Sequence, residues 1–389
     1  MTPAARVQAA IDIFDLILDG AAAEKALTGW ARRNRFAGSK DRAAIRDHVF
    51  DALRCKRSFG WLGGGETARR VLLGGLRAQG VDPASVFNGV GYAPAPLDED
   101  ENDGARELEA APQAVRLDAP DWLLPDLTRS LGGQLEPVLL RLRARAPVHL
   151  RANTTVASRE DVIARLSDDG IEAAPMSLSA TAIELAGAPR GLTTLRAFQD
   201  GWFELQDAAS QAVVDRLGPL VAGAEVLDFC AGGGGKSLAM AAYHPARLVA
   251  YDKDSDRMSD LPARARRAGV HISVAEDVTD AFDLVVCDAP CSGSGAWRRQ
   301  PAAKWNLTRA RLVELCEMQA EILNTAHKLV RPGGHLAYAT CSLLDVENDR
   351  QVEDFLTRHS DWTEVDRKSL TPLDGGDGFF IAVLRAPTG

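Results

Sequence analysis

Two Cys-Ser pairs hold the residues of this sequence that are best suited to covalent chemistry. The first lies in "DAPCSGSGAWRR" (288–299), which places Asp288, Cys291 and two arginines within twelve positions. The second lies in "LAYATCSLLD", where Cys341 occurs fifty residues after Cys291. A thiolate is a strong nucleophile, so the question is whether both thiols work in a reaction or only end buried strands.

One reaction that uses a thiol beside a methyl donor is methylation at carbon 5 of a pyrimidine. This carbon is a poor nucleophile, but addition of a thiolate to carbon 6 turns the ring into an enamine whose carbon 5 can attack a methyl sulfonium. An acid held against N3 helps the ring to accept the added electrons, and a base must then remove the proton from carbon 5. One thiol is needed for the attack, and a second could assist its release.

The elements that would position these residues are expected after Gly201. Short strands rich in Val, Leu and Ile alternate with helical stretches, which is typical of a parallel sheet covered on both faces. The last strand is expected to run antiparallel. Because Cys291 and Cys341 follow two strands that should be neighbours, both loops would face one cleft. The predicted strands are 225–230, 247–252, 271–276, 282–288, 335–340 and 379–385.

The first of these strands leads into a glycine-rich loop, "DFCAGGGGKS". Its four glycines let a ligand approach the backbone closely before a helix begins. The loop is not a P-loop, because position 230 is Cys instead of Gly. Asp252 ends the second strand about 20 residues later, where an acid can bind the ribose of NAD or of S-adenosylmethionine. Asp277 and Asp288 end the next two strands, and three such acids exceed what an NAD site requires.

The first half of the chain is predicted to form two further domains, since 389 residues exceed what one hydrophobic core usually serves. Residues 1–118 read as helices, including 5–21 with Leu16 on its apolar face and 39–62 after an N-cap at Ser39. The acidic stretch 97–109 looks like a linker or loop. Residues 119–200 mix helices with strands such as "VHLRANT" and "AIELAG", and residues 201–389 form the third domain.

Composition restricts the class of protein. No apolar run reaches the roughly 20 residues of a transmembrane helix, and the N-terminus lacks a signal-peptide layout, so a cytoplasmic protein is expected. Six scattered cysteines predict reduced thiols without a disulfide framework or a metal site. Of these, Cys55, Cys287 and Cys316 are expected to be buried as small hydrophobes. The net charge of −9 argues against non-specific coating of nucleic acid, although residues 32–57 hold nine Lys and Arg against three Asp.

Four motifs resemble those of the RsmB/Sun family of RNA 5-methylcytosine methyltransferases. In chain order they are "VLDFCAGGGGKS", "YDKD", "DLVVCDAPCSGSGAWRRQPAAKW" and "LAYATCS". "FQDGWFELQDAASQ" is similar to the segment that introduces the family's catalytic domain, so the resemblance covers residues 120–389. In one departure, the family usually has proline before Gly-Gly-Lys, where this sequence has glycine. The helical first third resembles, more weakly, the NusB-like RNA-binding domain of bacterial members.

The resemblance implies a fold and a set of roles. The fold would be a Rossmann-like methyltransferase domain with a seven-stranded, mostly parallel sheet, a small α/β subdomain and a helical NusB-like domain. Cys341 would be the attacking thiol and Cys291 would assist release, with Asp288 near the base and Lys304 as a further catalytic residue. S-adenosylmethionine would be held by Cys230, Ala231, Gly232, Gly233, Gly234, Gly235, Lys236, Asp252, Asp277 and Asp288. RNA contacts are expected at Arg32, Arg33, Arg35, Arg151, Arg298 and Arg299.

The favoured function is therefore transfer of a methyl group to carbon 5 of a cytosine in 16S rRNA or a small-subunit precursor, by a monomer without metal or membrane. Methylation of tRNA is an alternative within the same chemistry. A non-catalytic RNA-binding assembly factor is an alternative of another class, but it predicts loss of Cys341 or of the strand-end acids, and all are present. An NAD-dependent oxidoreductase would leave both Cys-Ser pairs unexplained.

Overall fold

The computed structural model describes residues 1–103 and 106–388. These residues divide into two compact units. Unit 1 holds the described residues of 1–128, 133–145 and 297–306, and unit 2 holds the remainder. No helix among the described residues is long and apolar enough to cross a membrane.

Unit 1 is helical, as its amphipathic patterns predict. The apolar stripe of α1 (Pro3–Leu18) buries Val7 and Phe14, whereas Leu16, predicted on the same face, is 42% exposed. The predicted helix 39–62 is divided at Cys55, and its N-cap is Gly38, whose N–H donates to the Asp41 carboxylate. The other helices are α2 (Ala23–Arg33), α3 (Ser39–Arg54), α4 (Lys56–Gly63), α5 (Ala68–Ala78), α6 (Glu99–Asp103), α7 (Gln113–Arg116), α8 (Leu124–Leu131) and α9 (Leu135–Leu142).

The acidic stretch 97–109 is not simply a linker, which corrects the prediction. Part of it forms α6, and Glu101 in this helix is 2% exposed. The Glu101 carboxylate accepts two hydrogen bonds of 2.7 Å from Arg69, and these bonds hold its pKa below the ordinary value. A buried, paired carboxylate therefore anchors the segment to unit 1. Residues 104 and 105 lie outside the described residues.

A segment from late in the sequence completes unit 1. It includes α15 (Pro301–Asn306), which packs beside α3. The Lys304 ammonium donates to the main-chain oxygen of Arg54 at 3.0 Å, and the Trp305 indole N–H donates to that of Leu53 at 2.6 Å. The Arg54 guanidinium in turn donates to the main-chain oxygen of Arg298 at 2.8 Å. The chain thus leaves unit 2 after Ala296 and returns to it at Leu307.

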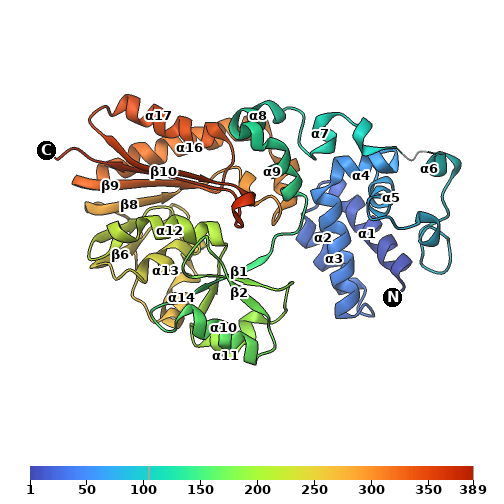
Figure 1. Ribbon diagram of the computed structural model, residues 1–389, viewed down its shortest axis with the longest axis horizontal. Coiled ribbons are helices and arrows are strands. Elements are labelled where there is room, and N and C mark those ends of the chain that lie inside the picture. The colour runs from blue at the N-terminus through green and yellow to red at the C-terminus, as the bar shows by residue number, and fades with distance from the viewer. Residues whose placement is uncertain (104–105, 389) are drawn as a thin grey trace. The chain divides into compact units, whose positions relative to one another are not determined.

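Unit 2 contains a four-stranded antiparallel sheet and a seven-stranded mixed sheet (Figure 1). The smaller sheet has the order β2-β3-β1-β4 and packs on α10 (Arg159–Asp168) and α11 (Arg196–Gln199). Two of its strands match the predicted ones, and the short β2 and β4 were not predicted. Its strands are β1 (Val148–Ala152), β2 (Ala173–Pro175), β3 (Ala182–Leu185) and β4 (Phe203–Leu205).

The seven-stranded sheet has the order β10-β11-β9-β8-β5-β6-β7. The five strands from β9 to β7 are parallel, and β11 pairs antiparallel with β9, as predicted for the last strand. The edge strand β10 was not predicted, because its mostly charged residues face solvent. The strands are β5 (Glu225–Asp228), β6 (Arg247–Ala250), β7 (Ser273–Val274), β8 (Phe282–Asp288), β9 (Val330–Thr340), β10 (Thr363–Leu370) and β11 (Phe379–Arg385).

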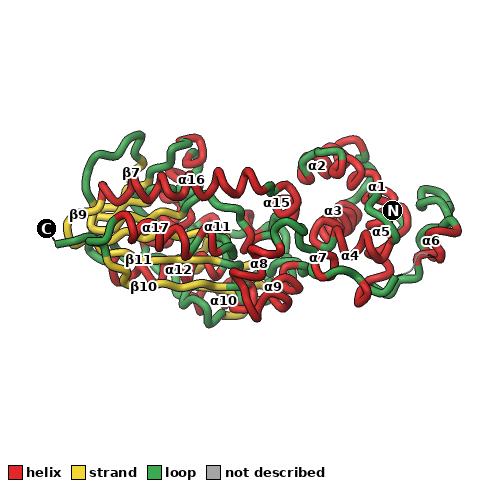
Figure 2. The backbone as a smooth tube through the Cα atoms, turned by 90° about the horizontal axis from the view of Figure 1, so that it is seen from above, coloured by secondary structure: helices red, strands yellow, loops and turns green. Residues whose placement is uncertain are grey.

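Helices cover both faces of this sheet, because alternate residues of each strand point to opposite sides. Val226 and Val286 pack with α12 (Ala208–Val221) and α13 (Gly235–Ala241) on one face. Leu227 and Val285 pack with α16 (Arg309–Ala326) and α17 (Asp349–Arg358) on the other, which is the face seen in Figure 2. A further helix, α14 (Leu261–Ala268), packs beside α13. The predicted mostly parallel sheet is confirmed. The resemblance of unit 1 to a NusB-like domain and the domain boundaries at residues 118 and 200 stay predictions.

Candidate active site

The order of the seven strands places the candidate site. From β5 the chain continues to β6 and β7 on one side, and then to β8 and β9 on the other. Ligands of open α/β sheets bind beyond the carboxyl ends of the strands at such a switch point. The glycine loop follows β5, Asp252 lies two residues after β6, and both Cys-Ser pairs follow β8 and β9. These predicted residues therefore belong to the same edge of the sheet.

Glycine is required in the loop between β5 and α13 for reasons of conformation and space. Gly234 is the N-cap of α13 at φ +76°, and a Cβ on it would lie 2.2 Å from the Leu261 side chain. Gly232 has φ +50°, and its N–H donates to Asp252 at 2.9 Å. Gly233 has no positive φ, so its backbone angle alone does not require glycine at this part of the loop, where proline is usual in the family.

Asp252 is buried and its carboxylate is already engaged. One oxygen accepts from Gly232 N, the other accepts from Asp254 N at 3.0 Å, and the Arg257 guanidinium lies within 3.0 Å of the carboxylate. Arg257 is half exposed and can swing away. A ribose that binds Asp252 through its hydroxyls would have to displace this guanidinium, since the carboxylate offers about four acceptor positions.

Asp288 and Lys236 form an ion pair at the switch point. The Lys236 ammonium, on the first turn of α13, lies 2.7 Å from the Asp288 carboxylate and 4.7 Å from the centre of the Phe379 ring. Lys236 is buried, whereas Asp288 remains about one third exposed. Asp288 is thus held by a cation while one side stays accessible. Asp277, in contrast, is exposed and accepts a hydrogen bond from the adjacent Val278 N–H, and no described contact joins it to the other acids.

Sequence reasoning missed Asp228, the last residue of β5. One of its oxygens accepts from the Ser237 hydroxyl, and the other has no hydrogen-bond partner among the described residues. Complete burial raises the pKa of Asp228 to about 7. An acid at the end of an apolar strand and just before a glycine loop was the available signal.

The two predicted thiols are in contact. The sulfur atoms of Cys291 and Cys341 lie 3.4 Å apart, because β8 and β9 are neighbouring parallel strands and each cysteine follows one of them closely. The hydrogen bond with Cys341 and burial together raise the pKa of Cys291 well above its ordinary value. When two thiols are this close, ionisation of one opposes ionisation of the other, so the pair tends to keep one proton.

Burial opposes ionisation of the other cysteines as well. Burial raises the pKa of Cys55 and of Cys316 to about 11, and it raises that of Cys230 and Cys287 further. Cys55 and Cys287 are buried, as expected, and Cys316 is half-buried. The two Cys-Ser pairs therefore remain the candidates for thiol chemistry.

A buried carboxylate, also missed, holds the serines of both pairs. Glu347 accepts hydrogen bonds from the hydroxyls of Ser292 and Ser342 and from the Ser292 N–H. Gln319 of α16 adds a fourth bond at 3.1 Å. No sequence spacing pointed to Glu347, because its partners come from three separate segments.

Several predicted residues lie elsewhere. Lys304 is 4% exposed and donates a hydrogen bond within unit 1, to the main-chain oxygen of Arg54. Arg298, also in unit 1, is 1% exposed, and Arg151 is 4% exposed with its guanidinium donating to Gln206. Both arginines are buried in this structure, and RNA contacts by Arg151 and Arg298 stay predictions. Arg299 is half-buried.

The remaining predicted RNA contacts lie on the surface of unit 1. Arg32 and Arg33 end α2, Arg35 follows it, and all three are exposed. No ion pair with an acid is found for them among the described residues. The adjoining Phe36 is 74% exposed, which is unusual for a large apolar side chain.

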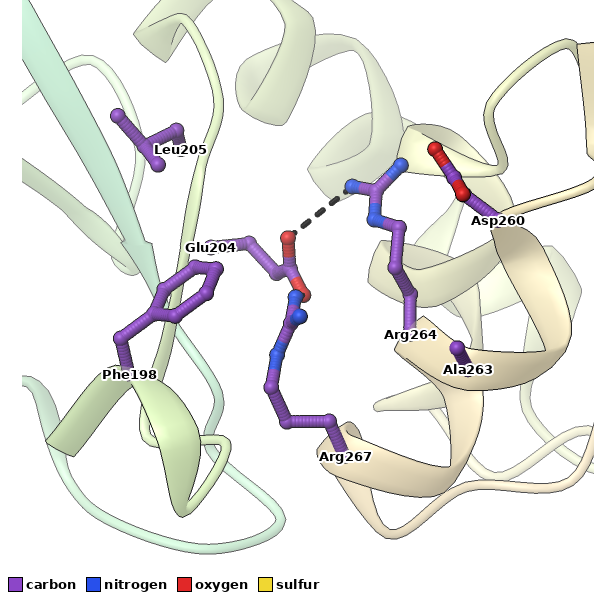
Figure 3. A pocket seen from close by; sticks show the side chains of 7 residues that line it. All are labelled: Phe198, Glu204, Leu205, Asp260, Ala263, Arg264 and Arg267. Carbon is purple, nitrogen blue, oxygen red and sulfur yellow. Dashed lines mark hydrogen bonds and ion pairs between the residues drawn. The ribbon is translucent and has the colours of Figure 1, made fainter. Parts of the chain in front are cut away.

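A pocket of about 370 Å³ adjoins the glycine loop (Figure 3). Glu204 of β4 faces two arginines of α14 across it: Arg264 donates to the carboxylate at 3.0 Å, and Arg267 pairs with its other oxygen. Arg264 also donates to the main-chain oxygen of Gly233. The pocket thus shares Arg264 with the loop, but no predicted donor-binding residue lines it.

The fold and the site together define a Rossmann-like domain of the methyltransferase type. The family model described as 16S rRNA methyltransferase RsmB/F matches residues 218–385, and that of the RsmF/B-like ferredoxin-like domain matches residues 119–190. A protein named ribosomal RNA small subunit methyltransferase B from Serratia proteamaculans is 35% identical over 68% of this chain and 66% of its own length. A protein of the same name from Citrobacter koseri is 34% identical over 71% of this chain and 68% of its own length. The chain therefore belongs to the RsmB/F family.

The match spans just under two thirds of the length of the Serratia relative. Among solved structures, the match with PH0851 covers 99% of this chain and 99% of the PH0851 chain, with a TM-score of 0.76 and 22% identity. NSun6 from Pyrococcus horikoshii, solved with SFG, covers 68% of the chain and 98% of its own, with a TM-score of 0.61 and 18% identity. At these identities the likeness shows the fold alone.

Proposed function

We propose that this protein transfers a methyl group from S-adenosylmethionine to carbon 5 of a cytosine in RNA of the small ribosomal subunit. The observation that carries the proposal is the pair of thiols 3.4 Å apart, beyond the carboxyl ends of β8 and β9. They share this edge of the sheet with the glycine loop and the strand-end acids. Family membership and the names of the relatives support RNA as the substrate.

In the proposed reaction Cys341 attacks and Cys291 assists release. The Cys341 sulfur forms a bond to carbon 6 of the cytosine, and the electron pair moves into the ring so that carbon 5 becomes nucleophilic. The carbon 5 electron pair forms a bond to the methyl group of S-adenosylmethionine, while the bond between that methyl group and sulfur breaks and S-adenosylhomocysteine leaves with the bonding electrons. Removal of the carbon 5 proton then returns the electrons, and the bond between carbon 6 and Cys341 breaks. The hydrogen bond between the sulfurs and burial raise the pKa of Cys291 well above its ordinary value, which suits Cys291 to the role of a proton-bearing partner.

The residues around the loop fit a methyl donor of this kind. The loop offers backbone N–H groups before α13, Asp252 can accept ribose hydroxyls once Arg257 moves, and Asp228 has a buried oxygen without a described partner. Asp288, held by Lys236, would face the N3 side of the target base. Gly233, Gly234 and Gly235 would line the adenosine side of the same loop.

Unit 1 supplies the proposed RNA surface. Three exposed arginines within residues 32–35 would contact phosphates, and Phe36 beside them offers a ring on which an unpaired base can stack. Unpaired bases are common in rRNA loops and in tRNA, so this surface alone does not separate the two substrates. The names of the relatives favour 16S rRNA.

A denaturing gel of the Cys291→Ala variant with S-adenosylmethionine and unmodified 16S RNA tests the proposal. We expect a protein–RNA band that resists denaturation, because the adduct forms and its release is slowed. The band should vanish when Cys341→Ala is added, and the single variant Cys341→Ala should bind donor without transferring a methyl group. Normal turnover by Cys341→Ala would overturn the assignment of the nucleophile. If the protein labelled tRNA and did not label 16S RNA, tRNA would be the substrate instead of 16S rRNA.

A further inference from the structure

Glu347 joins the two loops that carry the thiols. It ends a short 3-10 helix, Asp345–Glu347, and is fully buried. One carboxylate oxygen accepts from the Ser292 N–H at 2.8 Å, and the other accepts from the hydroxyls of Ser292 and Ser342. Because Ser292 follows Cys291 and Ser342 follows Cys341, one carboxylate holds the residue next to each thiol.

Further hydrogen bonds fix this carboxylate and close the connection between the loops. Gln319 donates from the same amide nitrogen to Glu347 at 3.1 Å and to the main-chain oxygen of Pro290 at 2.9 Å. The Tyr338 hydroxyl donates to the Glu347 main-chain oxygen at 2.7 Å. Ser294 lies 3.1 Å from the Ser342 hydroxyl. The position of Glu347 is therefore set from β9, α16 and both cysteine loops.

If stability were the only role of Glu347, burying a carboxylate at this position would be unfavourable. Burial of an ionised carboxylate costs several kcal/mol unless hydrogen bonds or a cation offset it. No described basic side chain forms an ion pair with Glu347, so the four donated hydrogen bonds carry the whole compensation. Apolar side chains could pack the same volume without this cost, but they could not hold two serines in fixed positions.

We propose that Glu347 is the positioning residue that sets the distance and orientation of the Cys291 and Cys341 sulfur atoms. It acts through Ser292 and Ser342 and makes no described hydrogen bond to either thiol, although its charge is one of the causes that raise the pKa of Cys291. The functional part of this inference rests on the proposed methyl transfer, in which the two sulfurs must work on one base in turn. The geometric part does not, because it concerns only the separation of the sulfurs in the protein alone.

The geometric part is tested by the rate at which diamide forms a disulfide between the two cysteines. The two thiols lose two electrons and two protons, and the N=N bond of diamide gains them to become a hydrazine. The wild-type protein should form this disulfide readily, because its sulfurs are already in contact. Glu347→Ala should form it about ten-fold more slowly or worse, the factor expected when a hydrogen bond to a buried charged group is lost. Mass spectrometry after proteolysis identifies the linked peptides.

Three further variants separate positioning from general stability. Glu347→Gln keeps the reach of the side chain, and because serine hydroxyls can also accept, it should oxidise within about three-fold of wild type. Ser342→Ala removes one arm of the connection and tests the proposal even if Glu347→Ala does not fold. Val352→Ala, in the buried core of α17, is the matched control: it should lower the unfolding midpoint but leave the oxidation rate unchanged.

Methyl transfer provides the second measurement. We expect Glu347→Ala to lower kcat by about ten-fold or more with little change in KM for S-adenosylmethionine, since the donor contacts lie on other loops. Wild-type oxidation rates in folded Glu347→Ala and Ser342→Ala would overturn the proposal. If the wild-type protein methylates no RNA, the proposed function fails while the oxidation result still stands or falls by itself.

Discussion

Lys304 has two possible roles that predict different behaviour with pH. The resemblance implies a catalytic lysine, whereas the structure places its ammonium in unit 1, 4% exposed and hydrogen-bonded to the Arg54 main-chain oxygen. Burial lowers the pKa of Lys304 from 10.5 to about 8, and the nearby Asp118 carboxylate offsets part of this effect. A buried lysine with a lowered pKa should therefore make stability depend on pH.

Proton linkage gives the sign and size of this dependence. Between pH 8 and 10.5 the unfolded chain holds the proton on Lys304 and the folded chain does not, so the free energy of unfolding rises with pH across this window. The full change in the free energy of unfolding is about 3 kcal/mol, because a difference of one in pKa corresponds to ~1.4 kcal/mol. Below pH 8 the lysine is charged in both states, and its contribution is constant and at its least favourable.

The variant Lys304→Met removes the ammonium and keeps the length of the side chain. In urea unfolding compared between about pH 7.5 and pH 10, the wild-type protein should gain about 2 kcal/mol more than the variant, since this range covers most of the window. Lys25→Met, at an exposed position of the same unit, is the control and should follow the wild type. If the free energy of unfolding changed with pH in the same way for wild type and Lys304→Met, the buried ammonium would be refuted. If Lys304→Met lost methyl transfer at unchanged stability, the lysine would be assigned to catalysis.

Three other predictions follow from the loop and the surface. Gly234→Ala should destabilise the protein by about 1–3 kcal/mol in urea unfolding, because its Cβ would collide with Leu261 at a positive φ; unchanged stability would mean that α13 shifts freely. Arg257→Ala should tighten S-adenosylmethionine binding several-fold by calorimetry, since about 1 kcal/mol of ion pairing no longer opposes it; weaker binding would make Arg257 a donor contact. Replacing all three arginines of residues 32–35 with Ala should reduce the salt dependence of RNA affinity by a slope of about two to three, and an unchanged slope would exclude this surface.

The sequence predicted those parts of the fold that depend on local pattern. Buried parallel strands are short apolar runs, so five of the seven strands of the large sheet, and β11 as an antiparallel strand, could be recognised. The sequence also predicted that Cys291 and Cys341 follow two neighbouring strands, and the structure adds that their sulfur atoms are in contact. The edge strand β10 escaped notice because one side of an edge strand faces solvent and carries charges.

What the sequence did not predict depends on contacts between distant segments. Arg151 reads as a surface charge, yet β1 buries it against Gln206. Lys304 and Arg298 follow a catalytic motif in sequence but fold into unit 1. Glu347 stands in an ordinary acidic stretch, and only the convergence of two serines and Gln319 reveals its role. Periodicity and spacing carry no information on such convergence.

The burial of Asp228 at the candidate site lowers the stability of the protein. Its folded pKa of about 7 lies above the ordinary 3.8, so the unfolded chain binds fewer protons between these values and the free energy of unfolding falls as pH rises through the window. Above pH 7 the penalty is about 4 kcal/mol. Asp228→Asn should therefore be more stable than wild type in urea at about pH 8, with a flatter pH profile, while it binds S-adenosylmethionine more weakly. A less stable variant at that pH would show that the buried oxygen has a partner after all, and unchanged donor affinity would mean that the carboxylate serves the fold of the loop and not the ligand.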